Sequence, residues 1–203
     1  MKKPSSFCVG LILAAGRSER MGEPKLNLPW GKTTVLGQVV KSLAEGGLRR
    51  IYIVINPLRM PEMPHEMFNV EITWIENPEA ETGEMLKSIQ TGLSALPEDV
   101  QNVLIALGDQ PTIRIDVVKI MLQTIQETEE TLIFPSYRMK RGHPWVVNKQ
   151  YWPEIRDLKS FDTPRTFIQA HANKIHYVNF DFEPPEDMDT PEMYHRLKIE
   201  TGM

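Results

Sequence analysis

A short segment near the N-terminus combines small residues, glycines and cations in a pattern that suits phosphate binding. It reads Ala-Ala-Gly-Arg-Ser-Glu-Arg-Met-Gly-Glu-Pro-Lys over residues 14–25. Small residues and glycines let a ligand approach the main chain, and exposed amides can cradle phosphate oxygens. Arg17, Arg20 and Lys25 could then neutralise a triphosphate. Neither a Walker A loop nor a dinucleotide fingerprint is present, so the segment indicates a different phosphate device or, alternatively, a polar surface loop with solvated arginines.

Two aspartates on separate segments could hold a metal ion. Asp109 follows the apolar run 102–107, and Asp189 lies in the sequence Asp-Met-Asp-Thr-Pro at 187–191. Hard oxygen ligands on separate segments suit Mg²⁺, which keeps several waters and bridges carboxylates to substrate phosphates. Asp189 also precedes Thr-Pro-Glu, a good start for a helix, so it could instead be a helix N-cap.

A basic loop is the third candidate. Arg138, Lys140, Arg141 and Lys149 lie within twelve residues that contain no acid, with Gly-His-Pro at 142–144 between them. Such a loop in an acidic chain could receive an anionic acceptor, although a solvated run of charge is the alternative.

These segments need a scaffold, and the hydrophobic pattern predicts one. Short apolar runs at 7–13, 50–55 and 102–107 are typical of strands buried on both faces. Between them, apolar residues recur at spacings of three and four, as in amphipathic helices. The alternation predicts right-handed βαβ units and a mainly parallel sheet, and hence an α/β fold. Ligands bind at the carboxyl ends of such strands, and both the segment 14–25 and Asp109 follow predicted strands.

Length and composition favour one globular domain spanning residues 1–203. The chain has 41% hydrophobic and 25% charged residues, which argues against a disordered or fibrous protein. It carries 23 lysines and arginines against 27 aspartates and glutamates, a net charge of −4. Nonspecific nucleic-acid binders usually carry a basic excess, so no nucleic-acid partner is expected.

The N-terminal apolar run bears on the compartment. Its single cysteine, Cys8, cannot form an intramolecular disulfide, and the apolar surroundings predict a buried thiol. The run at 7–15 is far shorter than the roughly 20 residues that span a bilayer, and it does not resemble a signal peptide. We therefore expect a cytoplasmic protein with no membrane partner.

Taken together, the motifs resemble those of nucleotidyltransferases, and of molybdenum cofactor cytidylyltransferases in particular. Residues 13–25 match the signature Leu-Ala-Ala-Gly-x-Ser-x-Arg-Met-Gly-x-Pro-Lys. Gly-Asp-Gln-Pro at 108–111, Asp-Met-Asp-Thr-Pro at 187–191 and Gly-His-Pro at 142–144 resemble three further family elements. The Ala-Ala-Gly form is similar to that of the cytidylyltransferases, whereas related guanylyltransferases usually have Ala-Gly-Gly. The resemblance implies a three-layer, Rossmann-like nucleotidyltransferase fold of the GT-A type.

The resemblance also implies a reaction. CMP would pass from CTP to the phosphate of molybdopterin with release of pyrophosphate, for the maturation of enzymes of the xanthine dehydrogenase type. The implied cofactor is Mg²⁺, and the implied partners are a nucleoside triphosphate, with CTP favoured, a molybdopterin-type acceptor and an apo-molybdoenzyme. Two alternatives stay open: a nucleotidyltransferase that uses GTP or a sugar or polyol phosphate, and a non-catalytic chaperone that delivers the cofactor.

Residue roles follow from the same resemblance. It assigns catalysis to Arg20, Lys25 and Asp109, and metal binding to Asp109 and Asp189. The role of Asp187 is open, because the family usually has Asn there. The resemblance assigns nucleotide binding to Leu13, Ala14, Ala15, Gly16, Arg17, Arg20, Lys25, Ser88 and Gly108, and acceptor binding to Arg141, Gly142, His143 and Pro144.

Two further stretches bear on the ligands. Asn77, Gly83, Ser88 and Gly92 match a family stretch of moderate specificity, for which turn formation and helix packing are the alternative. Residues 160–162 depart from the Gly-Asp-x-Gly pattern common near this position, which leaves the identity of the acceptor open.

Overall fold

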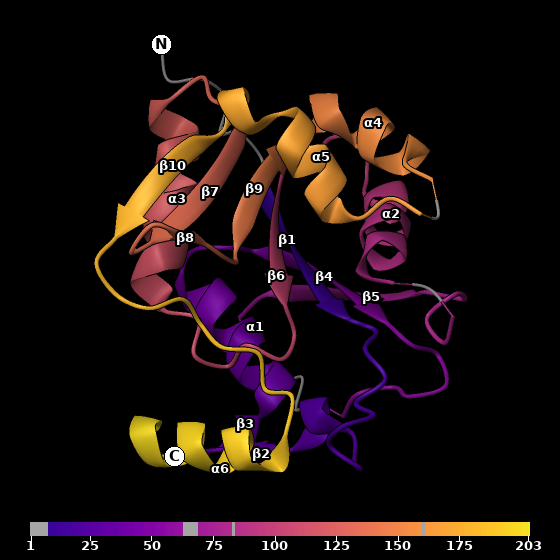
Figure 1. The fold of residues 1–203 in the computed structure, drawn as a ribbon, viewed down its shortest axis with the longest axis vertical. Coiled ribbons are helices and arrows are strands. Elements are labelled where there is room, and N and C mark those ends of the chain that lie inside the picture. Colours follow the sequence, from indigo (N-terminus) through magenta and orange to yellow (C-terminus); the bar gives the residue numbers. More distant parts are fainter. Residues whose placement is uncertain (1–7, 63–68, 83, 160) are drawn as a thin grey trace.

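One mixed sheet runs through the middle of the protein. The structure, a computed structural model, describes residues 8–62, 69–82, 84–159 and 161–203. The strands of this sheet are β1 (Cys8–Ala14), β4 (Arg50–Ile55), β5 (Glu71–Glu76), β6 (Asn102–Leu107), β7 (Leu132–Tyr137), β8 (Lys140–Arg141), β9 (Trp145–Asn148) and β10 (His176–Phe180). Their order is β10-β7-β9-β6-β1-β4-β5, and β8 pairs with β7 (Figure 1).

Most of the sheet is parallel, as the sequence predicted. The pairs β1/β4, β1/β6, β4/β5 and β7/β10 are parallel. Strand β9 runs antiparallel to both of its neighbours, β6 and β7. Two of the three predicted strands have the predicted bounds. The first, predicted at 7–13, is described from Cys8, since Phe7 lies outside the described residues, and it ends one residue later than predicted, at Ala14.

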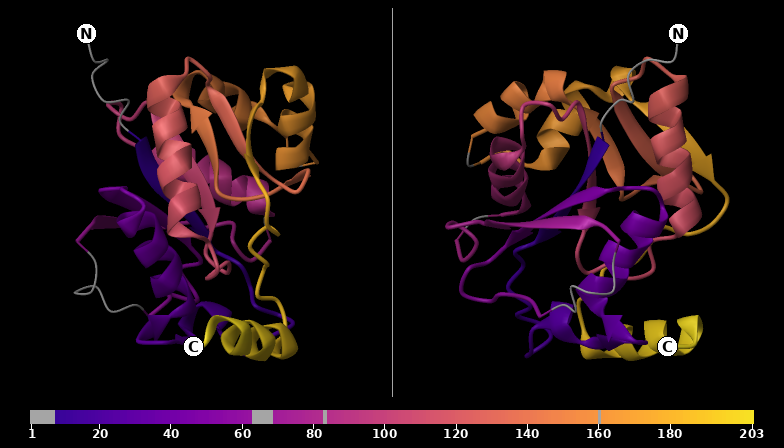
Figure 2. Two further views of the ribbon diagram at one scale, coloured as in Figure 1. Left: turned by 90° about the vertical axis from the view of Figure 1, so that its left-hand side faces the viewer. Right: turned by 180° about the vertical axis from the view of Figure 1, so that it is seen from behind.

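Helices cover both faces of the sheet. Alternate residues of β1 point to opposite faces, so Leu11 and Leu13 join one apolar cluster while Ile12 and Ala14 join the other. The protein is therefore a three-layer α/β fold, confirming the expected class (Figure 2). On the first face lie α2 (Met85–Ala95), α4 (Trp152–Asp157) and α5 (Pro164–Ala170), and on the second α1 (Val35–Glu45) and α3 (Ile115–Glu127).

The C-terminal segment returns across the molecule to the N-terminal half. After β10, residues 181–190 form an irregular strap that ends at α6 (Pro191–Thr201), beside the hairpin of β2 (Pro29–Trp30) and β3 (Thr33–Thr34) (Figure 1). A third apolar cluster holds the strap, α6 and the hairpin together. Its buried members are Met21, Leu28, Trp30, Val35, Met188, Tyr194 and Leu197. Short 3-10 helices are found at η1 (Lys25–Asn27), η3 (Lys149–Tyr151) and η4 (Ala172–Lys174).

The described part of the N-terminal apolar run lies inside the sheet. Cys8 is partly buried, and burial raises the pKa of its thiol to about 12. Within the described ranges, no helix is long and apolar enough to cross a membrane.

Gly92 sets the distance between α2 and the sheet. A Cβ atom at this position would lie 2.7 Å from Leu11 Cδ1 and 3.0 Å from Val54 Cγ2. Leu11 is fully buried and cannot easily move away. We therefore predict that Gly92→Ala destabilises the protein by about 1–3 kcal/mol in urea unfolding.

The sign of this effect distinguishes packing from helix propensity. In an exposed helix the same change would stabilise by about 1 kcal/mol, so a more stable Gly92→Ala variant would contradict the prediction. Ser94→Ala, on the exposed side of α2, is the control and should change the free energy of unfolding little.

Candidate active site

The loop after β1 folds into a tight turn that presents Lys25. Ser18 and Gly22 have positive φ angles of 55° and 72°. The Met21 amide donates to the Ser18 carbonyl at 3.1 Å, and the Lys25 amide donates to the Ser18 hydroxyl at 3.3 Å. Met21 is buried in the cluster beneath α6, which anchors the middle of the loop. Gly22 adopts its positive φ without steric cost and so helps the loop to turn back on itself.

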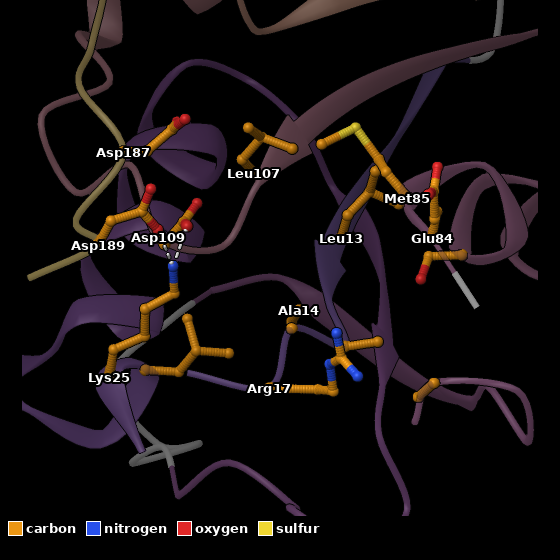
Figure 3. A pocket seen from close by; sticks show the side chains of 15 residues that line it. Leu13, Ala14, Arg17, Lys25, Glu84, Met85, Leu107, Asp109, Asp187 and Asp189 are labelled. Carbon is orange, nitrogen blue, oxygen red and sulfur yellow. Dashed lines mark hydrogen bonds and ion pairs between the residues drawn. The ribbon is translucent and has the colours of Figure 1, made fainter. Parts of the chain in front are cut away.

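Lys25 lies between two carboxylates that come from distant parts of the chain. Its Nζ atom is 2.5 Å from Asp109 Oδ2 and 2.9 Å from Asp189 Oδ1 (Figure 3). Arg20 Nη2 lies 2.6 Å from Asp189 Oδ2. The four side chains therefore form one charged cluster. Asp109 sits in the loop directly after β6, and Asp189 sits at the end of the strap.

The charges of this cluster depend on one another. Burial favours neutral Lys25, but the two aspartates outweigh it and raise the pKa of the ammonium. Burial raises the pKa of Asp109 more than Lys25 lowers it. Burial also acts to raise the pKa of Asp189, but the contacts with Lys25 and Arg20 outweigh it and leave that pKa lowered. Lys25 is thus cationic at neutral pH and is the main partner of both acids.

Asp189 is free for this role because its neighbour caps the helix. Thr190 is the N-cap of α6, and its hydroxyl accepts the Met193 amide at 3.3 Å. The alternative reading of Asp189 as the cap is therefore wrong. Asp162-Thr-Pro has the same form, and there too the threonine, Thr163, is the N-cap, of α5.

The strap is fixed to the loop after β6 at two points. The Met188 amide donates to the Asp109 carbonyl at 3.0 Å, and the Met188 side chain is fully buried. Gln110 Nε2 donates to Asp187 Oδ1 at 2.7 Å and to the Pro185 carbonyl at 3.3 Å. Asp187, whose role the sequence left open, thus accepts a hydrogen bond from the side-chain amide of Gln110, which follows Asp109 in the chain.

A cavity of about 280 Å³ opens beside the charged cluster. Lys25, Asp109 and Asp189 lie together at one side, and Glu84 and Met85 lie at the other (Figure 3). Most of the predicted nucleotide residues meet here. Lining residues include Leu13, Ala14, Ala15, Gly16, Arg17, Lys25, Leu26, Ala80, Glu84, Met85, Ser88, Leu107, Asp109, Asp187 and Asp189.

Three predicted nucleotide residues have distinct places. Gly108 donates its amide to the Leu13 carbonyl at 2.9 Å, so it joins the ends of β1 and β6 and is not among the lining residues. Ser88 is buried and its hydroxyl accepts Asn77 Nδ2 at 3.1 Å. Arg20 lines a second, polar cavity of about 310 Å³, which shares Lys25 and Asp189 with the first. Gly83 lies outside the described residues.

The sequence reasoning missed a latch that holds Arg17. Arg17 Nη1 donates to the Glu81 carbonyl at 3.0 Å, and Arg59 Nη1 donates to the Arg17 carbonyl at 2.5 Å. The buried Asn56 amide donates to the Glu81 carboxylate, which joins the loops after β4 and β5. Asn56 directly follows a buried strand, the position where ligands are expected in such sheets, and that signal could have found it.

The basic loop has acidic partners that the sequence did not suggest. Arg138 Nε lies 3.3 Å from Asp181 Oδ1, and Lys140 Nζ lies 3.0 Å from Glu183 Oε2. Both acids belong to the strap, which runs beside the β7–β8 hairpin. Part of the positive charge counted within the loop is therefore neutralised within the protein. Arg141 is exposed on β8.

His143 is neutral and lies near the charged cluster. Burial lowers the pKa of its imidazole to about 4, although the charge of Asp109 opposes the shift. Tyr137 donates its hydroxyl to the His143 carbonyl at 2.7 Å. Gly142 is partly buried and Pro144 is buried. The predicted acceptor residues are not among those that line the cavity beside the charged cluster. Among them, His143 has a pKa that the charge of Asp109 acts to raise.

The donor set fits a divalent cation that also binds phosphates. In the described ranges, no group of three His, Cys, Asp or Glu side chains is placed to hold a metal on its own. Asp109 and Asp189 nevertheless converge on one cation, the Lys25 ammonium. Two carboxylates suit Mg²⁺, whose remaining ligands are commonly waters and substrate phosphates.

The chain is similar in sequence to known proteins over most of its length. Residues 10–175 match the model of the MobA-like NTP transferase domain. The chain is 30% identical over 193 residues to the molybdenum cofactor cytidylyltransferase of Escherichia coli K12, covering 93% of this chain and 94% of the relative. It is 24% identical to the purine catabolism protein PucB of Bacillus subtilis 168, covering 96% and 97% of the two chains.

Solved structures share the fold. Rv0371c of Mycobacterium tuberculosis H37Rv, in a crystal structure with manganese, has a TM-score of 0.73 at 21% identity, covering 95% of this chain and 98% of that one. A homologue from Mycobacterium sp. strain JC1 gives 0.78 at 23% identity, covering 97% and 98%. On the sequence matches and the site geometry, the chain belongs to the MobA-like NTP transferase family and is a nucleotidyltransferase homologous to molybdenum cofactor cytidylyltransferases and guanylyltransferases.

Proposed function

We propose that the protein transfers CMP from CTP to the phosphate of a molybdopterin-type acceptor and releases pyrophosphate. The observation that carries the proposal is the convergence of Lys25, Asp109 and Asp189 beside a cavity lined by the loop after β1. The Ala-Ala-Gly sequence of that loop and the 30% identical cytidylyltransferase support CTP as the nucleotide. Maturation of an apo-molybdoenzyme in the cytoplasm is the setting that this reaction implies.

The reaction needs positioning and neutralisation of charge more than a proton-transfer base. An oxygen of the acceptor phosphate attacks the α-phosphorus of CTP, the bond from that phosphorus to the bridging oxygen breaks, and pyrophosphate leaves. The acceptor phosphate is anionic near neutral pH, so no base is required. Arg20 and Lys25 would stabilise the charge that grows on the pyrophosphate. Mg²⁺, held by Asp109 and Asp189, would polarise the α-phosphate.

The acceptor would approach from the side of the Gly-His-Pro segment. Arg141 is exposed there and could meet the acceptor phosphate, while Gly142 packs closely on the Tyr137 ring, where a Cβ atom would lie 3.0 Å from a ring carbon. A neutral His143 can donate or accept a hydrogen bond but adds no positive charge. We therefore assign it to orienting the acceptor.

Pyrophosphate release tests the proposal. Purified protein should release pyrophosphate from CTP when Mg²⁺ and molybdopterin are both present, and more slowly from GTP. A clear preference for GTP, or turnover with sugar or polyol phosphates instead of molybdopterin, would overturn the assignment. Nucleotide binding with no release for any acceptor would favour the delivery chaperone.

Asp109→Asn and Asp189→Asn should each lower this rate by about 10²–10³-fold, because each removes one charge from the metal site without changing side-chain size. Circular dichroism should show that both variants are folded. Asp181→Asn is the control, since Asp181 is an exposed aspartate of the same strap that pairs with Arg138. Turnover like that of the wild type in Asp109→Asn would remove Asp109 from the mechanism.

Met188→Ala should raise the Mg²⁺ concentration needed for half-maximal rate, because the buried side chain holds Asp189 in place. The void that Met188→Ala leaves in the apolar cluster should also lower the free energy of unfolding by about 2–5 kcal/mol. Met188→Leu should preserve both properties. Met121→Ala is the matched control: Met121 is equally buried but lies on α3 and packs into the apolar cluster on the other side of the molecule's sheet from α2, so stability should fall with no change in the Mg²⁺ requirement. An equal shift in both alanine variants would contradict the assignment.

Acid should destabilise the protein partly through His143. The pKa of His143 is about 4 in the folded state against an ordinary value of 6.5, so only the unfolded state gains this proton as pH falls from 6.5 to 4. Stability therefore decreases with falling pH, by about 1–3 kcal/mol from this group. Urea unfolding of His143→Gln at several pH values should show a smaller loss. A loss equal to that of the wild type would contradict this contribution of His143.

A further inference from the structure

The two carboxylates of the candidate metal site are already bound by cations of the chain itself. Asp189 is engaged at both oxygens, Oδ1 by Lys25 at 2.9 Å and Oδ2 by Arg20 at 2.6 Å. Asp109 Oδ2 is engaged by Lys25 at 2.5 Å. Any divalent cation that binds these acids therefore meets a lysine already there.

One site cannot hold both cations at once. Mg²⁺ binds oxygens at about 2.0–2.1 Å, so an ion bound to Asp109 Oδ2 and Asp189 Oδ1 would occupy the space of the Lys25 ammonium. Lys25 and Mg²⁺ together would also bring three positive charges within a few ångströms of one another, where they repel. A metal ion on these two oxygens would therefore displace Lys25.

The Lys25 side chain borders a second cavity as well. It lines both the cavity beside the charged cluster and the adjoining polar cavity, which is also lined by Gly16, Arg17, Ser18, Glu19, Arg20 and Asp189. A triphosphate in the polar cavity would offer the ammonium new anionic partners. Arg20 can move at little cost, since its side chain is 70% exposed, whereas that of Lys25 is 11% exposed.

We propose that Lys25 competes with the divalent cation for Asp109 and Asp189. The metal enters the site together with the triphosphate, whose oxygens then bind the Lys25 ammonium in place of the two carboxylates. This competition rests on the metal and triphosphate roles of the proposed function, but not on which nucleobase or which acceptor the protein binds. Lys25 then has opposite effects on the metal: it opposes the metal alone and supports the metal bound with nucleotide.

Titration with MnCl₂, followed through the electron paramagnetic resonance signal of the free ion, measures the first effect. Without nucleotide, Lys25→Met should bind Mn²⁺ about tenfold more tightly than the wild type, a coupling of ordinary size between two sites. Adding Asp109→Asn to this variant should abolish the gain. Unchanged or weaker Mn²⁺ binding in Lys25→Met, or a gain that survives Asp109→Asn, would overturn the proposal.

The same titration with α,β-methylene-CTP, which cannot release pyrophosphate, measures the second effect. The analogue should tighten Mn²⁺ binding to the wild type, and this enhancement should shrink by about tenfold in Lys25→Met. An enhancement equal in both proteins would overturn the exchange of partners. If the analogue does not bind, the GTP analogue replaces it, and only the CTP assignment fails.

Two controls separate competition from general effects. Lys32→Met removes the same charge from an exposed lysine before β3 and should leave Mn²⁺ binding unchanged. Thermal unfolding guards against misfolding, because Mn²⁺ should raise the melting temperature of Lys25→Met more than that of the wild type. If Lys25→Met does not fold, Lys25→Gln supplies the neutral side chain, and an equal Mn²⁺ effect on it and the wild type would refute the competition.

Discussion

A single ammonium group ties the three parts of the candidate active site together. Lys25 ends the loop after β1, Asp109 follows β6, and Asp189 lies at the end of the strap. Charges that are withdrawn from water are costly unless they are paired, and both aspartates are partly buried, so a nearby cation stabilises their charged forms. The path of the loop, the position of the strap and the docking of α6 all serve to bring these charges within contact.

The supporting packing is as specific as the charges. Met188 points into the apolar cluster beneath α6 and its backbone bonds to Asp109, while Asp187 and Asp189 on either side of it line the cavity. Tyr194 of α6 donates its hydroxyl to the Pro29 carbonyl at 2.7 Å. The alternation of apolar and acidic residues in Asp-Met-Asp therefore serves the anchor and the site at the same time.

The sequence was sufficient for three parallel strands of the central sheet and for most of the cavity, but not for the other strands or for long-range pairing. Apolar runs marked β4 and β6 directly because strands buried on both faces have few polar residues. Asp189 remained ambiguous because Asp and Thr are both good helix caps, and only the contact of Thr190 with Met193 decides between them. The latch at Glu81 and the pairs of Arg138 and Lys140 join segments whose proximity no local pattern encodes.

The position of Asp189 in the chain also sets the order in which the site can be built. Every strand of the sheet precedes it, and it lies beyond residues 10–175, which carry the family domain. During synthesis the N-terminal part of a chain emerges and begins to fold first. Lys25 and Asp109 can therefore pair while the ribosome still holds the strap, and the second acid joins them last. A partly made chain would have the loop after β1 without the complete pair of carboxylates.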